Sequence, residues 1–234
     1  MNKFEEAYEV VEVDNKTAHD IVVKYHYLHR RPNATKSYAL KLKADGHIVG
    51  VLQFGLVSSP AVEKGVCGEA YRHSVIELKR LFIFDETPKN TESWFIGQVL
   101  AMCPYEIILS FAEPKAGHLG IVYQSTNFLF CGATIKFNDY VFTDGRHPRS
   151  MHKMLQEYGG GAQAYKALGE GVMTKVARDR KYRYIFINAD KKRKKELMAN
   201  LRYPVYQYPK TLNVEEWEED AVVLRPTTYK QRRN

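Results

Sequence analysis

The stretch from Val75 to Pro114 constrains the fold more than any other part of the chain. It reads as a strand in VIELKRLFIF, a helix in NTESWFIGQVLAMC capped by Asn90 or Thr91, and a second strand in EIILSFAEP. A further helix is expected in HLGIVYQSTNF, after Pro114 ends the second strand. Strands joined through a helix in this way lie parallel in one sheet. The stretch therefore predicts a βαβα core.

The segments around this core predict one mixed α/β domain. EAYEVVEVDNK reads as a strand and TAHDIVVKYHYLHRRP as a helix, and SYALKLKADGHIVGVLQFG is typical of a hairpin because Gly46 tolerates positive φ. Residues 58–72 read as a loop, CGATIKFNDYVFTDG as one strand with its turn, AQAYKALGEG as a helix, and Arg202 onward as an irregular tail. We expect a catalytic core over residues 1–174, with a basic strand-helix segment and tail over residues 175–234 packed in the same domain.

Membrane and disulfide-rich classes do not fit the sequence. No segment approaches the roughly 18 apolar residues that span a bilayer, and the N-terminus lacks the basic flank and apolar run of a signal peptide. Cys67, Cys103 and Cys131 lie far apart and form no CxxC motif, so neither a disulfide framework nor a zinc cage is indicated. These features predict a cytoplasmic protein without a membrane partner.

The positive charge is concentrated near the C-terminus. Lys175–Lys210 holds twelve Lys and Arg against three Asp and Glu, so this segment accounts for the whole net charge of +8. Such a concentration indicates a polyanionic partner. The candidate DNA-binding residues are Arg30, Arg31, Lys181, Arg183, Lys191, Lys192, Arg193, Lys194 and Lys195.

Arg80 is the residue of the first strand that most needs a partner. At period two it shares a face with Ile76, Leu78, Phe82 and Phe84. An unpaired guanidinium costs several kcal/mol to bury, so something must satisfy it. One reading is structural: an ion pair with Glu113 or Glu92, or an edge strand whose face is wet. The other is that Arg80 binds an anionic substrate or cofactor through its bidentate fork.

Two strand-to-helix junctions offer further polar groups. The Thr91 and Ser93 hydroxyls and the free N–H groups in NTESW suit a phosphate or an oxyanion, although a simple cap explains Asn90 and Thr91 equally well. At the second junction Glu113 lies at the carboxyl end of a buried strand, where ligands bind in open α/β sheets. His118 and Tyr123 follow on the next helix. Their alternative readings are an ordinary first-turn residue and a core aromatic.

KYHYLHRRP is the third polar cluster. It places His26 and His29 three residues apart, with Tyr27 between them and arginines after them. Without a carboxylate at fixed spacing, HxxH is a weak metal motif. Aromatic residues interleaved with cations also suit a surface that binds nucleic acid.

Four segments between Tyr25 and Thr134 carry a family resemblance. HYLH, ELKRL, NTESW and ILSFAEPKAGHLGIVYQSTNFLFCGAT resemble the Mom family of phage DNA modification proteins. That family is similar to GCN5-related N-acetyltransferases and converts DNA adenine to its N6-carbamoylmethyl form, which masks phage DNA from host restriction. The resemblance implies an acetyltransferase-like mixed β-sheet flanked by helices, with a basic C-terminal extension, acting in the bacterial host cytoplasm.

The resemblance also implies site residues. It singles out His26, Tyr27, Arg80, Ser93 and Tyr123, while Glu113 stands where the family pattern has aspartate, which keeps the carboxylate and lengthens its reach by one methylene. With His118 added from the junction, the candidate catalytic residues are His26, Tyr27, Arg80, Ser93, Glu113, His118 and Tyr123.

Cofactors are implied in the same way. An acyl-CoA-like donor, acetyl-CoA or a related activated compound, is expected in the splayed region after ELKRL. Its candidate contacts are Leu81, Phe82, Asn90, Thr91 and Ser93. The phosphate loop of ordinary acyltransferases, Gln/Arg-x-x-Gly-x-Gly/Ala, is replaced by DETPKNTESWFIG. Alternatively, His26, Tyr27 and Glu113 hold a divalent metal such as iron.

The implied chemistry is alkylation of an exocyclic amine. Glu113 or Tyr123 would take the N6 proton, and Arg80 with Ser93 would stabilise developing charge. The adenine of double-stranded DNA would be flipped out, with Tyr27 or Tyr123 available to stack on it. Two other functions remain open: a GCN5-like acetyltransferase acting on a protein or small-molecule amine, and a DNA-binding protein without enzymatic activity.

Overall fold

The computed structural model describes residues 3–144 and 156–227, and the chain forms two compact units. The first combines Met1–Gly132 with Tyr182–Asn234, and the second is Ala133–Lys181. These two units are separated by how densely their residues contact one another. The expected boundary after residue 174 separates functions instead, and it stays a prediction. The catalytic role of residues 1–174 stays a prediction.

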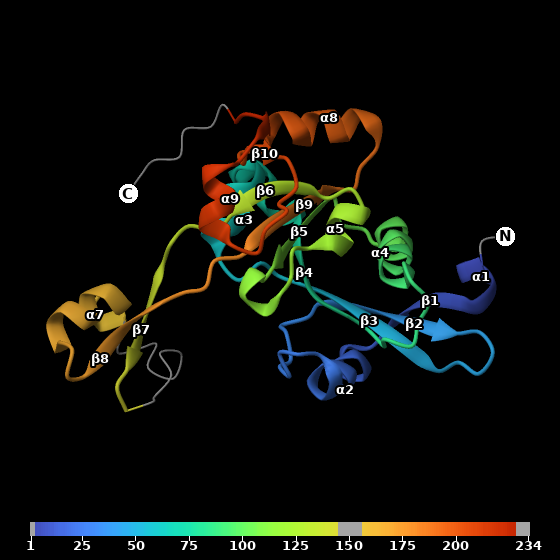
Figure 1. Cartoon of the computed structure of the whole chain (residues 1–234), viewed down its shortest axis with the longest axis horizontal. Helices are drawn as coiled ribbons and strands as arrows, with labels where there is room; N and C mark the ends of the chain where they lie inside the picture. Colours follow the sequence, from blue (N-terminus) through green and yellow to red (C-terminus); the bar gives the residue numbers. More distant parts are fainter. Residues whose placement is uncertain (1–2, 145–155, 228–234) are drawn as a thin grey trace. The chain divides into compact units, whose positions relative to one another are not determined.

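The first unit is built on a nine-stranded mixed sheet (Figure 1). Its order is β1-β2-β3-β4-β5-β9-β6-β10-β11, and β4 and β5 are parallel, whereas the β1/β2, β2/β3, β3/β4 and β5/β9 pairs are antiparallel. The strands are β1 Tyr8–Val13, β2 Lys36–Leu42, β3 Ile48–Gly55, β4 Val75–Ile83, β5 Ile107–Ala112, β6 Leu129–Ala133, β9 Tyr182–Ile187, β10 Val205–Tyr206 and β11 Val223–Arg225. The mixed α/β class, the parallel pair and the hairpin with Gly46 at φ 73° are confirmed.

Helices cover both faces of this sheet. They are α1 Lys3–Ala7, α2 Asn15–Tyr25, α3 Pro60–Cys67, α4 Thr91–Met102, α5 Ile121–Ser125, α8 Lys191–Asn200 and α9 Val214–Glu219. α2 packs against Phe82, while α3 and α8 pack around Val75 and Ile107. Strand alternation and the β3/β4 register place these core residues on one face. Tyr123 of α5 meets Ser110 on the opposite face, where α4 also packs.

A bulge in β4 changes the face on which Arg80 lies. Gln53 pairs with Arg80 and its neighbour Phe54 pairs with Leu78, so Lys79 is the extra residue. The extra residue resets the alternation of side chains. Arg80 therefore does not share a face with Leu78, as strict period two predicts, but lies on the face covered by α2.

β4 and β5 separate beyond the start of their pairing. Their parallel register runs from Val75–Ile107 to Glu77–Leu109, although β4 continues to Ile83 and β5 pairs with β9 as far as Ala112. The Ser110 hydroxyl donates to the Leu78 carbonyl at 3.1 Å, where the two strands diverge. The parallel pair thus opens toward its carboxyl end.

The second unit is a small antiparallel pair of strands with a helix packed on it and its own core. β7 (Asn138–Phe142) and β8 (Met173–Ala177) pair antiparallel, and α7 (Gly161–Leu168) packs on them through Ala164. The sequence predicted α7 but treated β6 and β7 as one strand, and it missed β8.

Other expected elements are corrected as well. Residues 58–72 are not a loop: they hold α3 and the start of a 3₁₀ helix, Glu69–Ser74, because Val66 and Cys67 bury an apolar stripe that the surrounding polar residues obscure. The helix expected in HLGIVYQSTNF is only the short α5, the first predicted strand begins with α1, and the tail after Arg202 contains β10, α9 and β11. No helix in the described part of the chain has both the length and the apolar character required to cross a bilayer.

Candidate functional site

Five of the predicted catalytic residues lie together in the first unit. The His26 and Tyr27 rings stack with centroids 4.4 Å apart, and the Tyr27 and His118 rings lie 5.1 Å apart. Tyr27 hydrogen-bonds with Glu113, and the charges of Arg80 and Glu113 both act on His26 and Tyr27. One polar cluster therefore contains residues that follow α2, Arg80 from the second half of β4, and Glu113, which follows β5.

Tyr27 holds the centre of this cluster. Its side chain is half exposed, and burial, followed by the charge of Glu113 and the hydrogen bond to it, raises the pKa of Tyr27 to about 12. The phenol consequently keeps its proton at neutral pH and donates to the Glu113 carboxylate. Because the side chain is half exposed, its aromatic ring is also of the kind on which a nucleobase can stack.

His26 follows the last turn of α2, rather than lying within a helix as predicted. It is 7% exposed, and its Nδ1 accepts from the Leu28 N–H at 3.1 Å. Burial, the charge of Arg80 and the charge of His118 lower the pKa of His26 to about 4. We infer a neutral imidazole at pH 7 with its proton on Nε2.

His26 should make stability depend on pH. Because the pKa of His26 in the folded state, about 4, lies below the ordinary 6.5, protonation of His26 disfavours the folded state. The contribution of His26 to the free energy of unfolding is therefore fully present above pH 6.5 and is lost as the pH falls toward 4. The contribution is on the order of 2 to 3 kcal/mol. We expect the free energy of unfolding of His26→Gln, measured with urea at pH 7 and pH 4.5, to fall less with acid than that of the unsubstituted chain. Equal falls would contradict the assignment.

Arg80 reaches the cluster because of the β4 bulge. Its Nη1 donates to the Lys79 carbonyl at 2.6 Å, and its Nε is buried without a hydrogen-bond partner among the described residues. Burial lowers its pKa, while the charges of Tyr27 and Glu113 act in the opposite direction. The charge of Glu113 thus acts on Arg80, the ion pair of the structural reading stays a prediction, and Arg80 keeps one N–H that a bound anion could use.

Tyr123 is both a core aromatic and a neighbour of the cluster. It packs against Phe128 and Tyr184 with centroids 5.3 Å away in each case. Its hydroxyl hydrogen-bonds with Ser110 at the β4/β5 divergence, and burial raises its pKa, so the phenol stays protonated. Sequence reasoning missed Ser110, although a lone serine within the apolar EIILSF was the available signal.

The start of α4 differs from its predicted geometry. Thr91 is 1% exposed and donates its hydroxyl to the Pro88 carbonyl at 2.5 Å, and the Ser93 hydroxyl donates to the Asn90 carbonyl at 3.0 Å. Asn90 precedes the helix at φ 72° and makes no side-chain cap. These hydroxyls close the turn instead of pointing out of it, which corrects the expected arrangement. The contribution of Ser93 to catalysis stays a prediction.

The proposed donor contacts on β4 also have protein neighbours. The Phe82 ring stacks on Tyr25 at 5.9 Å and meets Phe84 at 5.0 Å, and Leu81 pairs with Leu52. The Phe82 ring therefore packs against the end of α2, and Leu81 lies opposite Leu52 of β3. What β4 still offers to a ligand is its main chain beyond Glu77, where its register with β5 has ended.

The metal site implied for His26, Tyr27 and Glu113 stays a prediction. Their side chains lie in one cluster, in which Nδ1 of His26 accepts from the Leu28 N–H and the Tyr27 phenol bonds to Glu113. Over residues 3–144 and 156–227, no three His, Cys, Asp or Glu side chains are grouped as metal ligands. We derive no step of the reaction through a metal.

Two predicted DNA-binding cations have structural roles. Arg183 is 8% exposed, donates to the Cys131 carbonyl at 3.2 Å and stacks over Tyr203. Nε and Nη2 of Arg193 donate hydrogen bonds to the two carboxylate oxygens of Glu106, at 2.7 and 2.8 Å. Arg183 is therefore too buried for the predicted contact with phosphate, whereas for the partly exposed Arg193 that contact stays a prediction.

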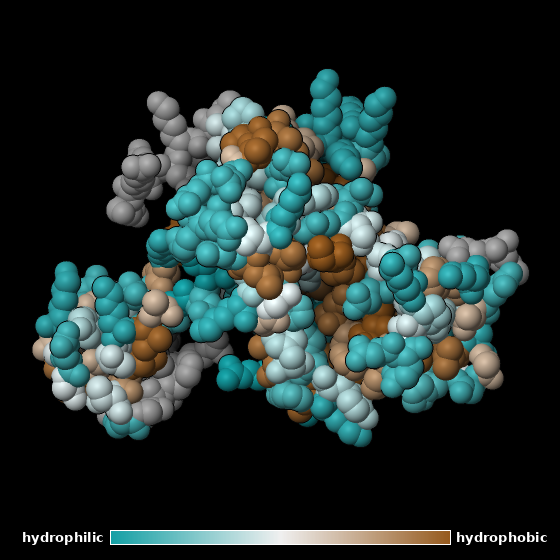
Figure 2. Space-filling view, viewed as in Figure 1, coloured by the Kyte–Doolittle hydropathy of each residue, from teal (hydrophilic) through white to brown (hydrophobic). Residues whose placement is uncertain are grey.

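The remaining candidate cations are more accessible. Arg31 is exposed and reaches Asp20 at 3.5 Å, Arg30 is exposed, and Lys181 is half-buried. Hydrophilic side chains stand out from α8 (Figure 2). Those that are exposed and predicted to bind DNA are Lys191, Lys192, Lys194 and Lys195.

Known proteins resemble this chain in sequence and in structure. The solved structures include a ribosomal-protein-S5-alanine acetyltransferase from Vibrio fischeri, with 11% identity and a TM-score of 0.44 over 79% of this chain and 95% of that one. An acetyltransferase of the GNAT family from Streptococcus pneumoniae gives 10% identity and a TM-score of 0.41 over 77% and 98%. A methylcarbamoylase from Escherichia phage Mu is 30% identical over 201 residues, 82% of this chain and 80% of the relative. The family model described as the Mom protein family matches residues 7–210, and the chain belongs to that family.

Proposed function

We propose that the chain is a DNA-modifying transferase that places a carbamoylmethyl group on N6 of adenine and so protects phage DNA from restriction. Membership of the Mom family and similarity to a methylcarbamoylase support the reaction class. The observation that carries the proposal is the cluster in which Tyr27 hydrogen-bonds with Glu113, the charges of Arg80 and Glu113 act on Tyr27, and Arg80 Nε is buried without a partner among the described residues. It combines a proton acceptor, an anion-binding group and an aromatic surface.

Glu113 is the better proton acceptor of the two candidates. As the N6–carbon bond forms, the amine must lose a proton, and a carboxylate can take it. Tyr123 keeps its own proton because burial raises its pKa, so it can donate to a leaving group. Arg80 would stabilise negative charge that develops on the transferred group or on the leaving group.

The donor would occupy the divergence between β4 and β5. An acyl-CoA-type molecule carries amide groups that can pair with an open strand edge, and β4 has such an edge beyond Glu77. When bound, this donor would carry the carbamoylmethyl group in activated form. Its bond from the methylene carbon to the leaving group would break as the N6–carbon bond forms. Tyr123 and Ser110 lie at the same divergence, next to the strand edge.

The target adenine must leave the duplex, because N6 is not accessible to an active site while the base is stacked and paired. Tyr27 is half exposed and offers its ring to the flipped base. Base stacking on an aromatic side chain contributes about 1 to 3 kcal/mol.

The α8 lysines provide a test of the contact with DNA. We expect replacement of Lys191, Lys192, Lys194 and Lys195 by Ala to weaken binding to duplexes of any sequence. The slope of log affinity against log salt should also fall, by about 0.9 for each phosphate that the variant no longer neutralises. Arg72→Ala is a control, because Arg72 is held by Glu63 and Glu69. An unchanged slope in the lysine variant would contradict this contact.

Nucleoside analysis tests the proposed reaction. The protein is expressed in bacteria, plasmid DNA is digested to nucleosides, and deoxyadenosine is examined by mass spectrometry for the added mass of a carbamoylmethyl group. Unmodified deoxyadenosine, from folded protein in a host that contains the donor, would overturn the proposal. Acetylation of an amine from acetyl-CoA without DNA would instead support the acetyltransferase alternative.

A further inference from the structure

The second unit contains a two-stranded ribbon with one covered face. β7 and β8 pair in register from Asn138–Ala177 to Phe142–Met173. Side chains directly opposite one another in an antiparallel pair share a face, so this register divides the ribbon residues into two sets.

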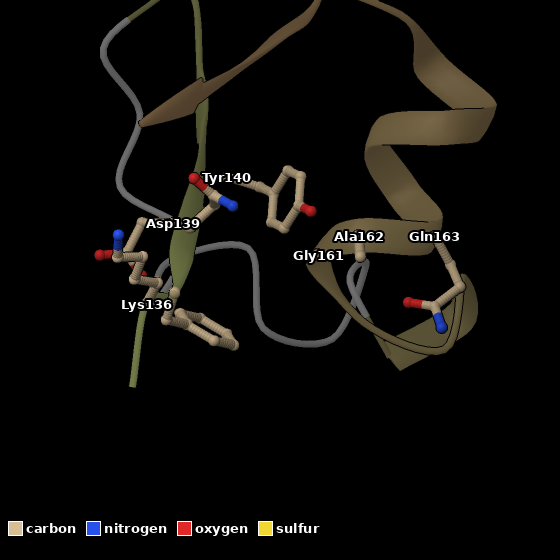
Figure 3. Close-up of a pocket in the computed structure, with 8 residues that line it drawn as sticks. Lys136, Asp139, Tyr140, Gly161, Ala162 and Gln163 are labelled. Atoms are coloured by element: carbon tan, nitrogen blue, oxygen red, sulfur yellow. The ribbon is translucent and has the colours of Figure 1, made fainter. Parts of the chain in front are cut away.

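One set packs against α7. Phe142 and Met173 form the small core with Ala164, and Tyr140 lies 5.3 Å from the Tyr165 ring. Figure 3 shows Tyr140 pointing toward α7, beside a cavity of about 500 Å³ between β7 and the start of that helix. This set faces protein.

The other set faces away from α7. Its members are Asp139, Val141, Thr174 and Val176, paired as Asp139–Val176 and Val141–Thr174. Val176 is 45% exposed, Thr174 is exposed, and neither valine belongs to the core around Ala164. β-branched side chains favour strands that pack against something, so this open face suits a surface that docks on a partner.

The charge around the open face favours a polyanion. Residues 135–142 and 173–181 contain five Lys and Arg and two Asp and Glu, a net charge of +3. Arg178 lies 5.0 Å from the Phe137 ring and forms a two-pronged ion pair with Asp139, at the end of the ribbon. This ion pair lies at one end of the open face, and the other members of the face, Val141, Thr174 and Val176, are uncharged.

We propose that the open face of the β7–β8 ribbon enters the major groove of the DNA substrate, with Thr174 and Val176 against the base edges. The major groove is about 12 Å wide and admits a two-stranded ribbon. Five paired positions extend about 16 Å, close to the rise of five base pairs. Threonine can bond base edges, and valine methyl groups can contact the methyl of thymine. The inference rests on DNA being the substrate, as in the proposed function.

Cross-linking to groove-specific tethers tests this placement. The native cysteines, Cys67, Cys103 and Cys131, are buried, so Thr174→Cys adds one accessible thiol. The full chain is mixed with duplexes that carry a disulfide tether on C5 of thymine in the major groove or on N2 of guanine in the minor groove. We expect at least tenfold more cross-linked product from the major-groove tether. Ala167→Cys, exposed on α7, is the control and should show no such preference. Equal yields from both tethers, or from both variants, would overturn the inference.

A second pair of variants measures binding. Val176→Asp should weaken duplex binding about tenfold, whereas Ala167→Asp adds the same charge on α7 and should leave binding within twofold. Equal effects would contradict the ribbon placement. Nucleoside analysis of the unsubstituted protein separates the two proposals. Modified adenine without ribbon-specific cross-links overturns the inference alone, whereas ribbon-specific cross-links without modified adenine support groove docking and overturn the proposed reaction.

Discussion

Replacing Arg80 with Met is expected to lower adenine modification by two to three orders of magnitude while the protein stays folded. Loss of one preorganised donor to developing charge typically costs about 10²- to 10³-fold in rate. Methionine keeps an apolar side chain of similar length, but the substitution removes the bond from Arg80 to the Lys79 carbonyl and takes the nearby positive charge away from Glu113, so we also expect a lower melting temperature. Nucleoside mass spectrometry measures the product, and thermal melting measures the fold.

Two further variants make this result specific. Arg80→Lys keeps the charge without the planar fork, so it should recover only part of the activity. Arg72→Met removes an arginine that is held in surface ion pairs with Glu63 and Glu69, so product formation should be unchanged. Full activity in Arg80→Met, with unchanged stability, would show that Arg80 has no part in the reaction.

Glu113→Gln should reduce the rate by about 10²- to 10⁴-fold, the usual contribution of a general base. The amide keeps the shape of the side chain but cannot take the N6 proton. Tyr27→Phe removes the phenol that hydrogen-bonds with Glu113 and should cause a smaller loss. The matched control is Glu92→Gln, an exposed carboxylate in the first turn of α4. Single-turnover rates across pH measure the effect, and an unchanged pH profile in Glu113→Gln would place the proton acceptor elsewhere.

Local patterns predicted the strands and helices that bury one clear face. VIELKRLFIF, EIILSFAEP and the Gly46 hairpin carry strong alternation or apolar runs, and each forms the expected strand. α3 and β8 were missed because their stabilising contacts are made with distant residues: Val66 packs in the core that contains Leu197, and Met173 pairs with Phe142. Such contacts leave little periodicity in a short segment.

The sequence predicted which candidate residues lie near one another better than it predicted their geometry. Polar residues at the ends of strands pointed to Arg80 and Glu113, which do lie near each other. A strict alternation of side chains cannot predict the bulge at Lys79, however, so the predicted face of Arg80 was wrong. A count of charges likewise cannot show that Arg183 is enclosed by Tyr203 and the Cys131 carbonyl.

The chain enters and leaves the second unit at two points that are hydrogen-bonded to each other. β6 and β9 are neighbours in the nine-stranded sheet, and between them the Thr134 N–H donates to the Lys181 carbonyl at 2.8 Å. The Lys181 N–H in turn donates to the Thr134 hydroxyl at 3.0 Å. Because the entry and exit points are hydrogen-bonded to each other, we expect that residues 133–181 can be replaced by another segment in a chimera while β4, which carries Arg80, and β5, which leads to Glu113, keep their sequence.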